Sequence, residues 1–264
     1  MSITSFADFS DLNAIATAFG RDGVVVLRGF APAEQVAAIR AEAMRQLELR
    51  LPPLELEAEL GYPGAPKSSD EQGGATIRRL RGMAARDAVF LNWAGQHNLL
   101  QLIARLISSA DITLTQAHHN SLMTKQPSFS SDTLWHRDVR YWRFARPELV
   151  SSWLALGDES PANGGLGFIA GSHLASFPDT AFDEREFLLP EHPAAAPWVS
   201  QAEFPTLVAG DVVLFDARTF HAASRNSTAN TKYSLVFSYH ARDNLPQLGS
   251  RSASLSGISW SIER

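Results

Sequence analysis

The chain has 264 residues, of which 45% are hydrophobic and 19% are charged, a composition that allows one sizeable core within a single domain. Its formal net charge of −5 excludes a basic field over the whole molecule, so neither nucleic acid nor an anionic membrane is an expected partner. No cysteine is present, which excludes disulfide bonds and thiolate chemistry and is compatible with a cytoplasmic protein.

The first 110 or so residues are expected to form a mainly helical layer. The amino terminus has neither a basic region nor a continuous apolar region, so no signal peptide is expected. Asp11 can cap a helix that runs toward Phe19, and Pro32 suits the start of a second helix. Apolar residues at helical spacing mark a third helix over 99–107, and Val24–Leu27 is typical of a short buried strand.

Residues 51–76 are rich in proline, glycine and charge, and they are expected to form a long surface loop. Loops of this length often serve as functional lids. Directly after it comes a basic cluster, Arg78, Arg79 and Arg81, which could reach a pocket from the helical layer.

From residue 111 onward, short β-rich runs alternate with turn residues. This texture is typical of an antiparallel sandwich or barrel. We therefore predict one domain over 1–264, with the helical layer at about 1–110 and a β core at about 111–242. The predicted strands are 112–119, 150–156, 166–171, 211–216 and 233–240.

A candidate metal site begins with His136 and Asp138, two positions apart in LWHRD. On an extended strand these side chains point to the same face. His221, beyond the strand predicted to end near Phe215, is the candidate third ligand. Two histidines and one carboxylate are the ligand set of non-haem Fe(II) oxygenases. Zinc hydrolases can use the same set, so the spacing alone leaves both open.

Three longer motifs carry a resemblance to a known family. LWHRDVRYWRF, NGGLGFIAGSH and AGDVVLFDARTFHAASRN resemble the phytanoyl-CoA dioxygenase family, in the family's order, over about residues 112–242. The resemblance implies a mainly β protein with a double-stranded β-helix (jelly-roll, cupin-like) core. It also implies Fe(II) bound by His136, Asp138 and His221, with 2-oxoglutarate as cosubstrate and O2 as oxidant.

The family's reaction is hydroxylation or desaturation of a small molecule, with release of succinate and CO2. We expect the substrate to be a small metabolite or natural-product intermediate. The sequence does not indicate the oligomeric state. Relatives that halogenate replace the carboxylate ligand by a small residue, so Asp138 favours hydroxylation or desaturation. Two alternatives remain: a non-catalytic small-molecule binding or sensing protein on the same scaffold, and a zinc or manganese cupin-like hydrolase or isomerase.

The sequence departs from the family's pattern at the cosubstrate anchor. The family usually has an arginine about eleven residues after the distal histidine, and this chain has Lys232 there. Lysine keeps the charge but loses the bidentate fork, and we expect it to hold the far carboxylate of 2-oxoglutarate. Arg225 is the fallback anchor. Ala223 stands where some relatives carry a small hydroxyl residue, with Ser224 adjacent.

Further cosubstrate contacts are expected from a strand running over 112–125. If alternation holds, His119, Ser121, Met123 and Lys125 share one face of it, and His118 points to the other. Trp153 resembles a tryptophan found near the cosubstrate. After the metal motif come three aromatic residues that could equally form a substrate wall or a sheet core: Tyr141, Trp142 and Phe144.

Overall fold

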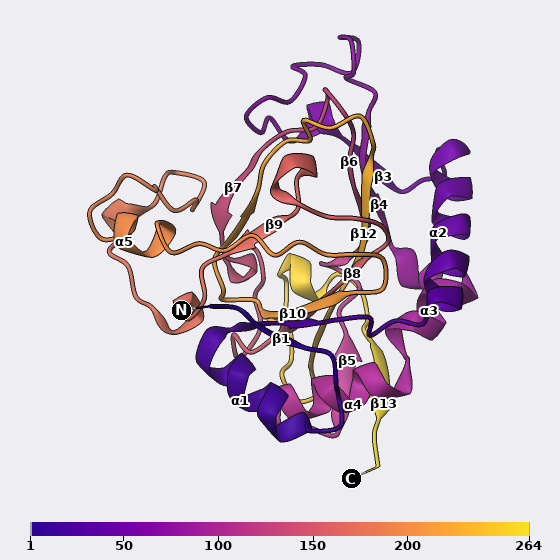
Figure 1. Cartoon of the computed structure of the whole chain (residues 1–264), viewed down its shortest axis with the longest axis vertical. Coiled ribbons are helices and arrows are strands. Elements are labelled where there is room, and N and C mark those ends of the chain that lie inside the picture. The colour runs from indigo at the N-terminus through magenta and orange to yellow at the C-terminus, as the bar shows by residue number, and fades with distance from the viewer. Residues whose placement is uncertain (1, 264) are drawn as a thin grey trace.

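The computed structural model describes residues 2–263. Two β-sheets face each other, and the helices within residues 12–106 pack on the outer face of the larger sheet (Figure 1). No helix within 2–263 is long and apolar enough to cross a bilayer. The helices are α1 (Leu12–Asp22), α2 (Ala33–Glu48), α3 (Ala88–Ala94), α4 (His97–Leu106) and α5 (Ala196–Val199).

The larger sheet has ten strands and the smaller has three. In spatial order the larger sheet contains β1 (Thr4–Phe6), β2 (Val24–Leu27), β10 (Val212–Asp216), β8 (Val150–Ala155), β12 (Lys232–Ala241), β6 (Asn120–Lys125), β4 (Ile77–Arg81) and β3 (Leu54–Leu56); β5 (Asp111–Leu114) pairs with β12 and with β13 (Ile258–Ser261). The smaller sheet contains β7 (Thr133–His136), β11 (His221–Ala223) and β9 (Leu166–Phe168). This is the expected jelly-roll core.

Alternation along the central strand β12 separates the two sides of the larger sheet. Leu235, Phe237 and Tyr239 pack into the core beneath the helices, whereas Val236 faces the smaller sheet. Successive side chains of a strand point to opposite faces, so Lys232 is carried to the same side as Val236. The sequence of β12 therefore places a lysine between the two sheets.

The amino-terminal layer contains more β structure than expected. Asp11 caps α1 as predicted, since its carboxylate accepts hydrogen bonds from the backbone N–H groups of Asn13 (3.0 Å) and Ala14 (2.9 Å). However, β1, β2, β3 and β4 all join the larger sheet, and α3 was not predicted. The loop expected over 51–76 begins with β3, which pairs with β4.

The prediction of a single strand over 112–125 is wrong. Both β5 and β6 pair with β12, and on β12 only Ser238 lies between the two paired segments. The N–H of Thr115 donates to the Ser238 carbonyl (2.9 Å) and the N–H of Ser238 donates to the His119 carbonyl (3.0 Å). Residues 115–119 thus leave the strand and return to it opposite the single residue Ser238, and we call this segment the excursion. The alternation of side chains between the two faces of the sheet does not continue across it.

Candidate metal centre and cosubstrate pocket

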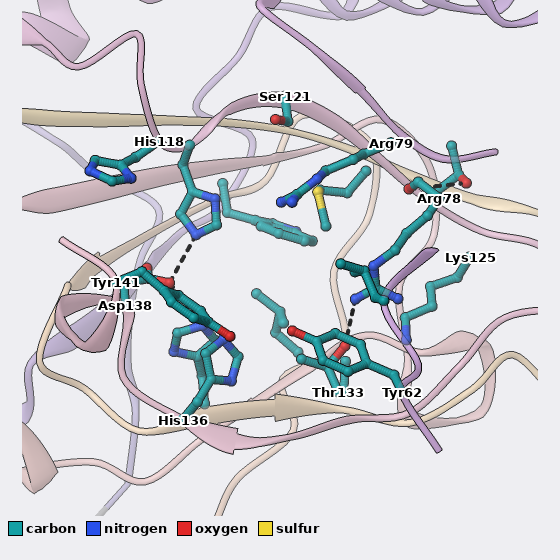
Figure 2. A pocket seen from close by; sticks show the side chains of 18 of the residues that line it. Tyr62, Arg78, Arg79, His118, Ser121, Lys125, Thr133, His136, Asp138 and Tyr141 are labelled. Atoms are coloured by element: carbon teal, nitrogen blue, oxygen red, sulfur yellow. Dashed lines mark hydrogen bonds and ion pairs between the residues drawn. The ribbon is translucent and has the colours of Figure 1, made fainter. Parts of the chain in front are cut away.

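A cavity of about 230 Å³ lies between the two sheets (Figure 2). It is lined from the larger sheet by β4, β6, β8, β10 and β12, and from the smaller sheet by β7, β9 and β11. Leu60 and Tyr62, from the loop after β3, also line it, so part of the predicted lid does border the pocket. We distinguish three parts of this cavity by the residues that line them: the metal end (His136, Asp138 and His221), the inner end (Arg78, Lys125 and Lys232) and the rim (Arg79, Arg81 and Arg251).

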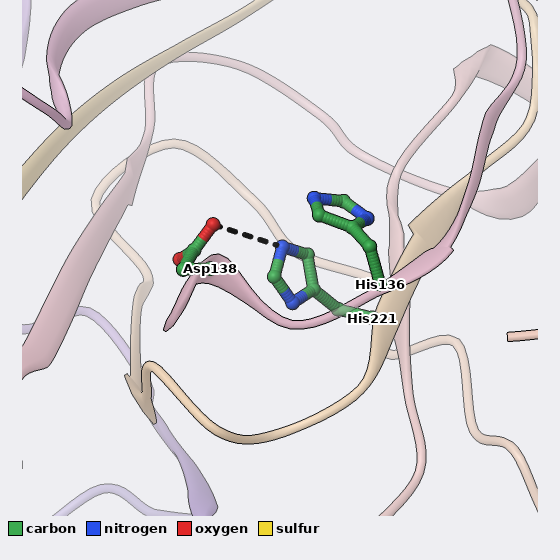
Figure 3. A group of neighbouring side chains, drawn as sticks. All are labelled: His136, Asp138 and His221. Carbon is green, nitrogen blue, oxygen red and sulfur yellow. Dashed lines mark ion pairs between the residues drawn. The ribbon is translucent and has the colours of Figure 1, made fainter. Parts of the chain in front are cut away.

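The metal end brings together the three predicted ligands (Figure 3). His136 is the last residue of β7 and His221 the first of β11, and the two residues are directly paired between the strands. Asp138 opens a short 3-10 helix, η3 (Asp138–Arg140). One potential ligand atom from each of the three lies within 4.8 Å of the others, and all three residues are buried. This group could hold a metal ion.

The ring orientation of both histidines suits metal binding. Nδ1 of His136 lies 2.8 Å from the Leu134 carbonyl, and Nδ1 of His221 lies 3.0 Å from the Thr219 carbonyl. A carbonyl oxygen only accepts, so each Nδ1 carries the proton and each Nε2 keeps a free lone pair. Burial also lowers the pKa of both rings, which favours the neutral form that ligates metals.

Asp138 has one oxygen that the protein leaves without a partner. Its Oδ1 lies 3.0 Å from Nε2 of His119 and 3.8 Å from Nε2 of His221. Its Oδ2 is buried and, among the described residues, has no hydrogen-bond partner. Burial would raise the pKa of this carboxyl, but the neighbouring histidines outweigh it and lower the pKa below the ordinary value. A buried, ionised carboxylate with a free oxygen fits a bound cation.

At the inner end, Lys232 belongs to a buried network that the sequence did not reveal. Its ammonium lies 3.4 Å from the Glu159 carboxylate and 2.9 Å from the Ser234 hydroxyl. Ser234 donates to the same carboxylate (2.6 Å), and the indole N–H of Trp153 donates to it as well (3.1 Å). The Trp153 ring lies beneath the ammonium at 4.8 Å. Burial lowers the pKa of Lys232, and Glu159 opposes that shift.

Lys125 lies directly opposite Lys232 in the pairing of β6 with β12, so both side chains face the cavity. Its ammonium donates to the Ser131 carbonyl, and among the described residues it forms no ion pair with a carboxylate. Burial and the charges of Arg78 and Lys232 lower the pKa of Lys125 to about 7, while the charges of Glu57 and Asp132 oppose this shift.

Arg78 completes the inner end. The predicted basic cluster does reach the pocket, but from strand β4 of the larger sheet and not from a helical layer. Its guanidinium pairs with Glu57 (3.1 Å) and donates to the hydroxyls of Ser131 (2.7 Å) and Thr133 (3.0 Å). The ring of Tyr62, from the lid segment, lies 4.8 Å from the guanidinium. In Figure 2, Arg78 and Lys125 lie together, across the cavity from His136 and Asp138.

The other residues predicted for the cosubstrate divide by location. Ser121, Met123, Trp153 and Ala223 line the cavity, as does His119, although the hydrogen bond of His119 goes to Asp138. Arg225 does not line it: its guanidinium is paired with Asp132 at 2.6 Å on the surface.

Two further predictions concern the residues around the metal end. The expectation that His118 and His119 point to opposite faces is wrong, because they lie in the excursion before β6 and both line the cavity. Tyr141 and Trp142 form part of the cavity wall, whereas Phe144 does not line the cavity and packs behind it, in one buried cluster with Trp142 and against His240.

No motif or pattern in the sequence indicated that two further residues, Glu159 and Arg251, belong to the pocket region. Glu159 follows β8 in an isolated bridge with Leu207, and Arg251 lies in a short 3-10 helix, η7 (Arg251–Ala253), beyond the segment that resembles the family. The structure brings Arg251 to the rim because the Ser252 hydroxyl contacts Nε2 of His118 at 2.6 Å.

Comparisons with known proteins agree with this geometry. The sequence model of the family described as phytanoyl-CoA dioxygenase (PhyH) matches residues 19–234. An ectoine dioxygenase of Stutzerimonas stutzeri (strain A1501) is 27% identical over 246 residues, covering 87% of this chain and 76% of the relative. The dioxygenase FrzG of Cladobotryum sp. is 24% identical over 235 residues, covering 82% of this chain and 70% of the relative.

Solved structures share the fold. EctD from S. alaskensis with bound Fe superposes with a TM-score of 0.73 at 22% identity, covering 95% of this chain and 86% of that one. The epimerase SnoN, in complex with Fe3+, alpha-ketoglutarate and nogalamycin RO, has a TM-score of 0.68 at 23% identity, covering 89% of this chain and 85% of that one.

Proposed function

The chain belongs to the phytanoyl-CoA dioxygenase family, and from this premise we propose that it is an Fe(II)- and 2-oxoglutarate-dependent oxygenase that hydroxylates or desaturates a small molecule. The products of the cosubstrate are succinate and CO2. The observation that carries the proposal is the buried group of His136, Asp138 and His221, with the free Asp138 oxygen, at one end of a cavity whose other end is cationic.

In this proposal His136 and His221 bind iron through Nε2, and Asp138 binds it through its carboxylate. Iron bound there supplies the activation of O2 and the oxidising power. The protein's own part is to keep the ligand atoms in place. The Leu134 and Thr219 carbonyls hold the two rings in the required tautomer, and His119 orients the Asp138 carboxylate by its hydrogen bond at 3.0 Å.

The far carboxylate of 2-oxoglutarate is proposed to bind at the inner end. Three cations, Arg78, Lys125 and Lys232, meet two carboxylates, Glu57 and Glu159, which leaves one net positive charge. One carboxylate of the cosubstrate balances that charge. Since the ion pairs use Arg78 and Lys232, Lys125 contributes the unpaired charge, while Lys232 adds a donor whose own charge Glu159 compensates.

The cavity walls would exclude water and position the substrate beside the metal end. Trp142 stacks on His118 with ring centroids 5.0 Å apart and meets His119 edge-on at 5.4 Å. Tyr62 packs edge-on against Phe187 at 5.8 Å, which holds the lid segment over the inner end. The cavity volume of about 230 Å³ is below the range of roughly 300–1,000 Å³ typical of drug-sized ligands, which favours a small substrate.

We extend the proposal to the setting of the reaction. The relatives include ectoine dioxygenases, which supports a small metabolite or natural-product intermediate as the substrate. The net charge of −5 supports the absence of a nucleic-acid partner. No membrane partner is proposed, and the lack of cysteine supports a cytoplasmic location.

Turnover of 2-oxoglutarate tests the proposal. Purified protein loaded with Fe(II) should form succinate slowly without substrate, at a rate that depends on both O2 and 2-oxoglutarate. The matched variant Asp138→Ala should keep the circular dichroism spectrum of the wild type and lose succinate formation. Catalysis that proceeds without O2 or 2-oxoglutarate would identify a hydrolase or isomerase instead. An intact metal site without any succinate formation would identify a binding protein.

A further inference from the structure

The rim of the cavity carries positive charge that neither the metal nor the cosubstrate uses. Three arginines line the cavity there: Arg79 and Arg81 from β4, and Arg251 from η7. We call them the rim arginines. Figure 2 shows the side chain of Arg79 projecting into the cavity above the metal end.

Strand pairing directs two of these arginines inward. In the ladder between β4 and β6, Arg79 lies opposite Met123 and Arg81 lies opposite Ser121. Directly opposed residues of an antiparallel pair share a face, and both Met123 and Ser121 line the cavity. The two arginines therefore stand on the cavity face of the sheet, Arg79 half-buried and Arg81 exposed.

Arg251 reaches the same place from the other end of the chain. The hydroxyl of its neighbour Ser252 contacts Nε2 of His118 (2.6 Å) and accepts from the N–H of Arg143 (2.8 Å). These bonds fix η7 beside the metal end. Burial lowers the pKa of Arg251, and the charges of Arg81 and Arg79 lower it further, so the three guanidiniums lie within range of mutual repulsion.

Only one carboxylate compensates this group. Glu55 pairs with Arg79 at 2.6 Å, while Nε of Arg79 is buried without a partner among residues 2–263. Within the same residues, neither Arg81 nor Arg251 forms a side-chain ion pair. The rim thus has two net positive charges. At the inner end, the far carboxylate of 2-oxoglutarate already balances the one positive charge. The two positive charges of a bound Fe(II) ion would be balanced by Asp138 and by the other carboxylate of 2-oxoglutarate.

We propose that the substrate is an anion whose carboxylate, phosphate or sulfonate group binds the rim arginines, with the carbon to be oxidised pointing inward toward the metal end. This inference rests on the proposed function and names the substrate class of that site. Guanidinium groups bind such oxyanions through paired N–H donors, and among residues 2–263 Arg81 and Arg251 have no carboxylate partner that would compete for theirs. The compact cavity leaves the charged group at the rim and the apolar part between Trp142 and the metal end.

Binding of four matched probes tests the inference: 3-phenylpropanoate, 2-phenylethylphosphonate, 3-phenylpropanamide and 2-phenylethylamine. Saturation-transfer NMR is recorded on anaerobic protein with Fe(II) and saturating 2-oxoglutarate, so that the inner end is occupied. The two anions should bind at least tenfold more tightly than the amide and the amine. A preference between carboxylate and phosphonate then separates the two kinds of oxyanion.

The double variant Arg81→Gln/Arg251→Gln should lose at least tenfold in affinity for the anions and keep its affinity for 2-oxoglutarate. Arg45→Gln, which removes an exposed charge on α2 far from the cavity lining, is the matched control and should bind like the wild type. Equal affinity for all four probes, including no detectable binding of any, would overturn the proposal, as would full anion binding by the double variant. Succinate formation without a probe reports separately on the proposed function.

Discussion

Replacing Lys125 with methionine should weaken 2-oxoglutarate binding more than removing the Lys232–Glu159 pair does. Methionine keeps an unbranched apolar side chain of similar length and deletes the only cation of the inner end that forms no ion pair among the described residues. A hydrogen bond to a charged group contributes about 1.5–3 kcal/mol. Lys125→Met should therefore raise the Kd for 2-oxoglutarate by about 10- to 150-fold, since roughly 1.4 kcal/mol is tenfold.

Lys232 needs a different design because its partner is fully buried. Lys232→Met alone would leave the Glu159 carboxylate uncompensated, at a cost of about 3–5 kcal/mol in the free energy of unfolding. The double variant Lys232→Met/Glu159→Gln removes both charges together and keeps the net charge of the inner end. It should recover most of that stability and raise the Kd by about 2- to 10-fold, because it removes one hydrogen-bond donor worth about 0.5–1.5 kcal/mol and leaves the charge-assisted bond of Lys125 in place.

Isothermal titration calorimetry of 2-oxoglutarate into anaerobic Fe(II)-loaded protein measures these constants, and urea unfolding measures stability. Lys125→Arg is the control, because arginine keeps the charge. If the double variant lost as much affinity as Lys125→Met, or more, then Lys232 would be the principal anchor and the charge accounting of the inner end would be wrong.

Three further outcomes are expected. Affinity for 2-oxoglutarate should fall as pH rises above 7, because burial and neighbouring cations hold the pKa of Lys125 at about 7 and only the protonated ammonium attracts a carboxylate; Lys125→Arg should abolish this dependence in titrations between pH 6 and 9. His119→Ala should weaken Fe(II) binding by about 10- to 100-fold through loss of its bond to Asp138, as measured by competition with a chelator; unchanged Fe(II) affinity would remove the positioning role. Gly164→Ala should destabilise the protein by about 1–3 kcal/mol in urea unfolding, because Gly164 has a φ of +82° and an added Cβ would lie 2.7 Å from the Ser224 carbonyl oxygen; an unchanged midpoint would contradict this.

The metal end could be predicted because its signal is local and its motifs are long. His136 and Asp138 stand two residues apart, and His221 lies in a motif that fixes its place on the opposing strand. The iron-ligand role itself remains a prediction. The jelly-roll core followed from the same motifs, and short β-rich runs between turn residues located β8, β9, β10 and β12.

Lys125 and Lys232 were predicted for the inner end, but the network of carboxylates around them could not be predicted, because these charges meet through tertiary contacts. Lys232 and Glu159 are 73 residues apart, and nothing in the sequence of the segment after β8 indicates a buried carboxylate. The register that sets Lys125 opposite Lys232 likewise depends on the excursion at 115–119, where β propensity continues but pairing is interrupted. A one-residue difference there reverses which side chains face the cavity.

Anaerobic titration with Fe(II) tests the central claim most directly. Wild-type protein should bind one equivalent of Fe(II) per chain in the presence of 2-oxoglutarate, and His136→Ala, Asp138→Ala and His221→Ala should each weaken that binding by at least tenfold while the protein stays folded. Binding of Fe(II) by all three variants with wild-type affinity would show that the metal lies elsewhere.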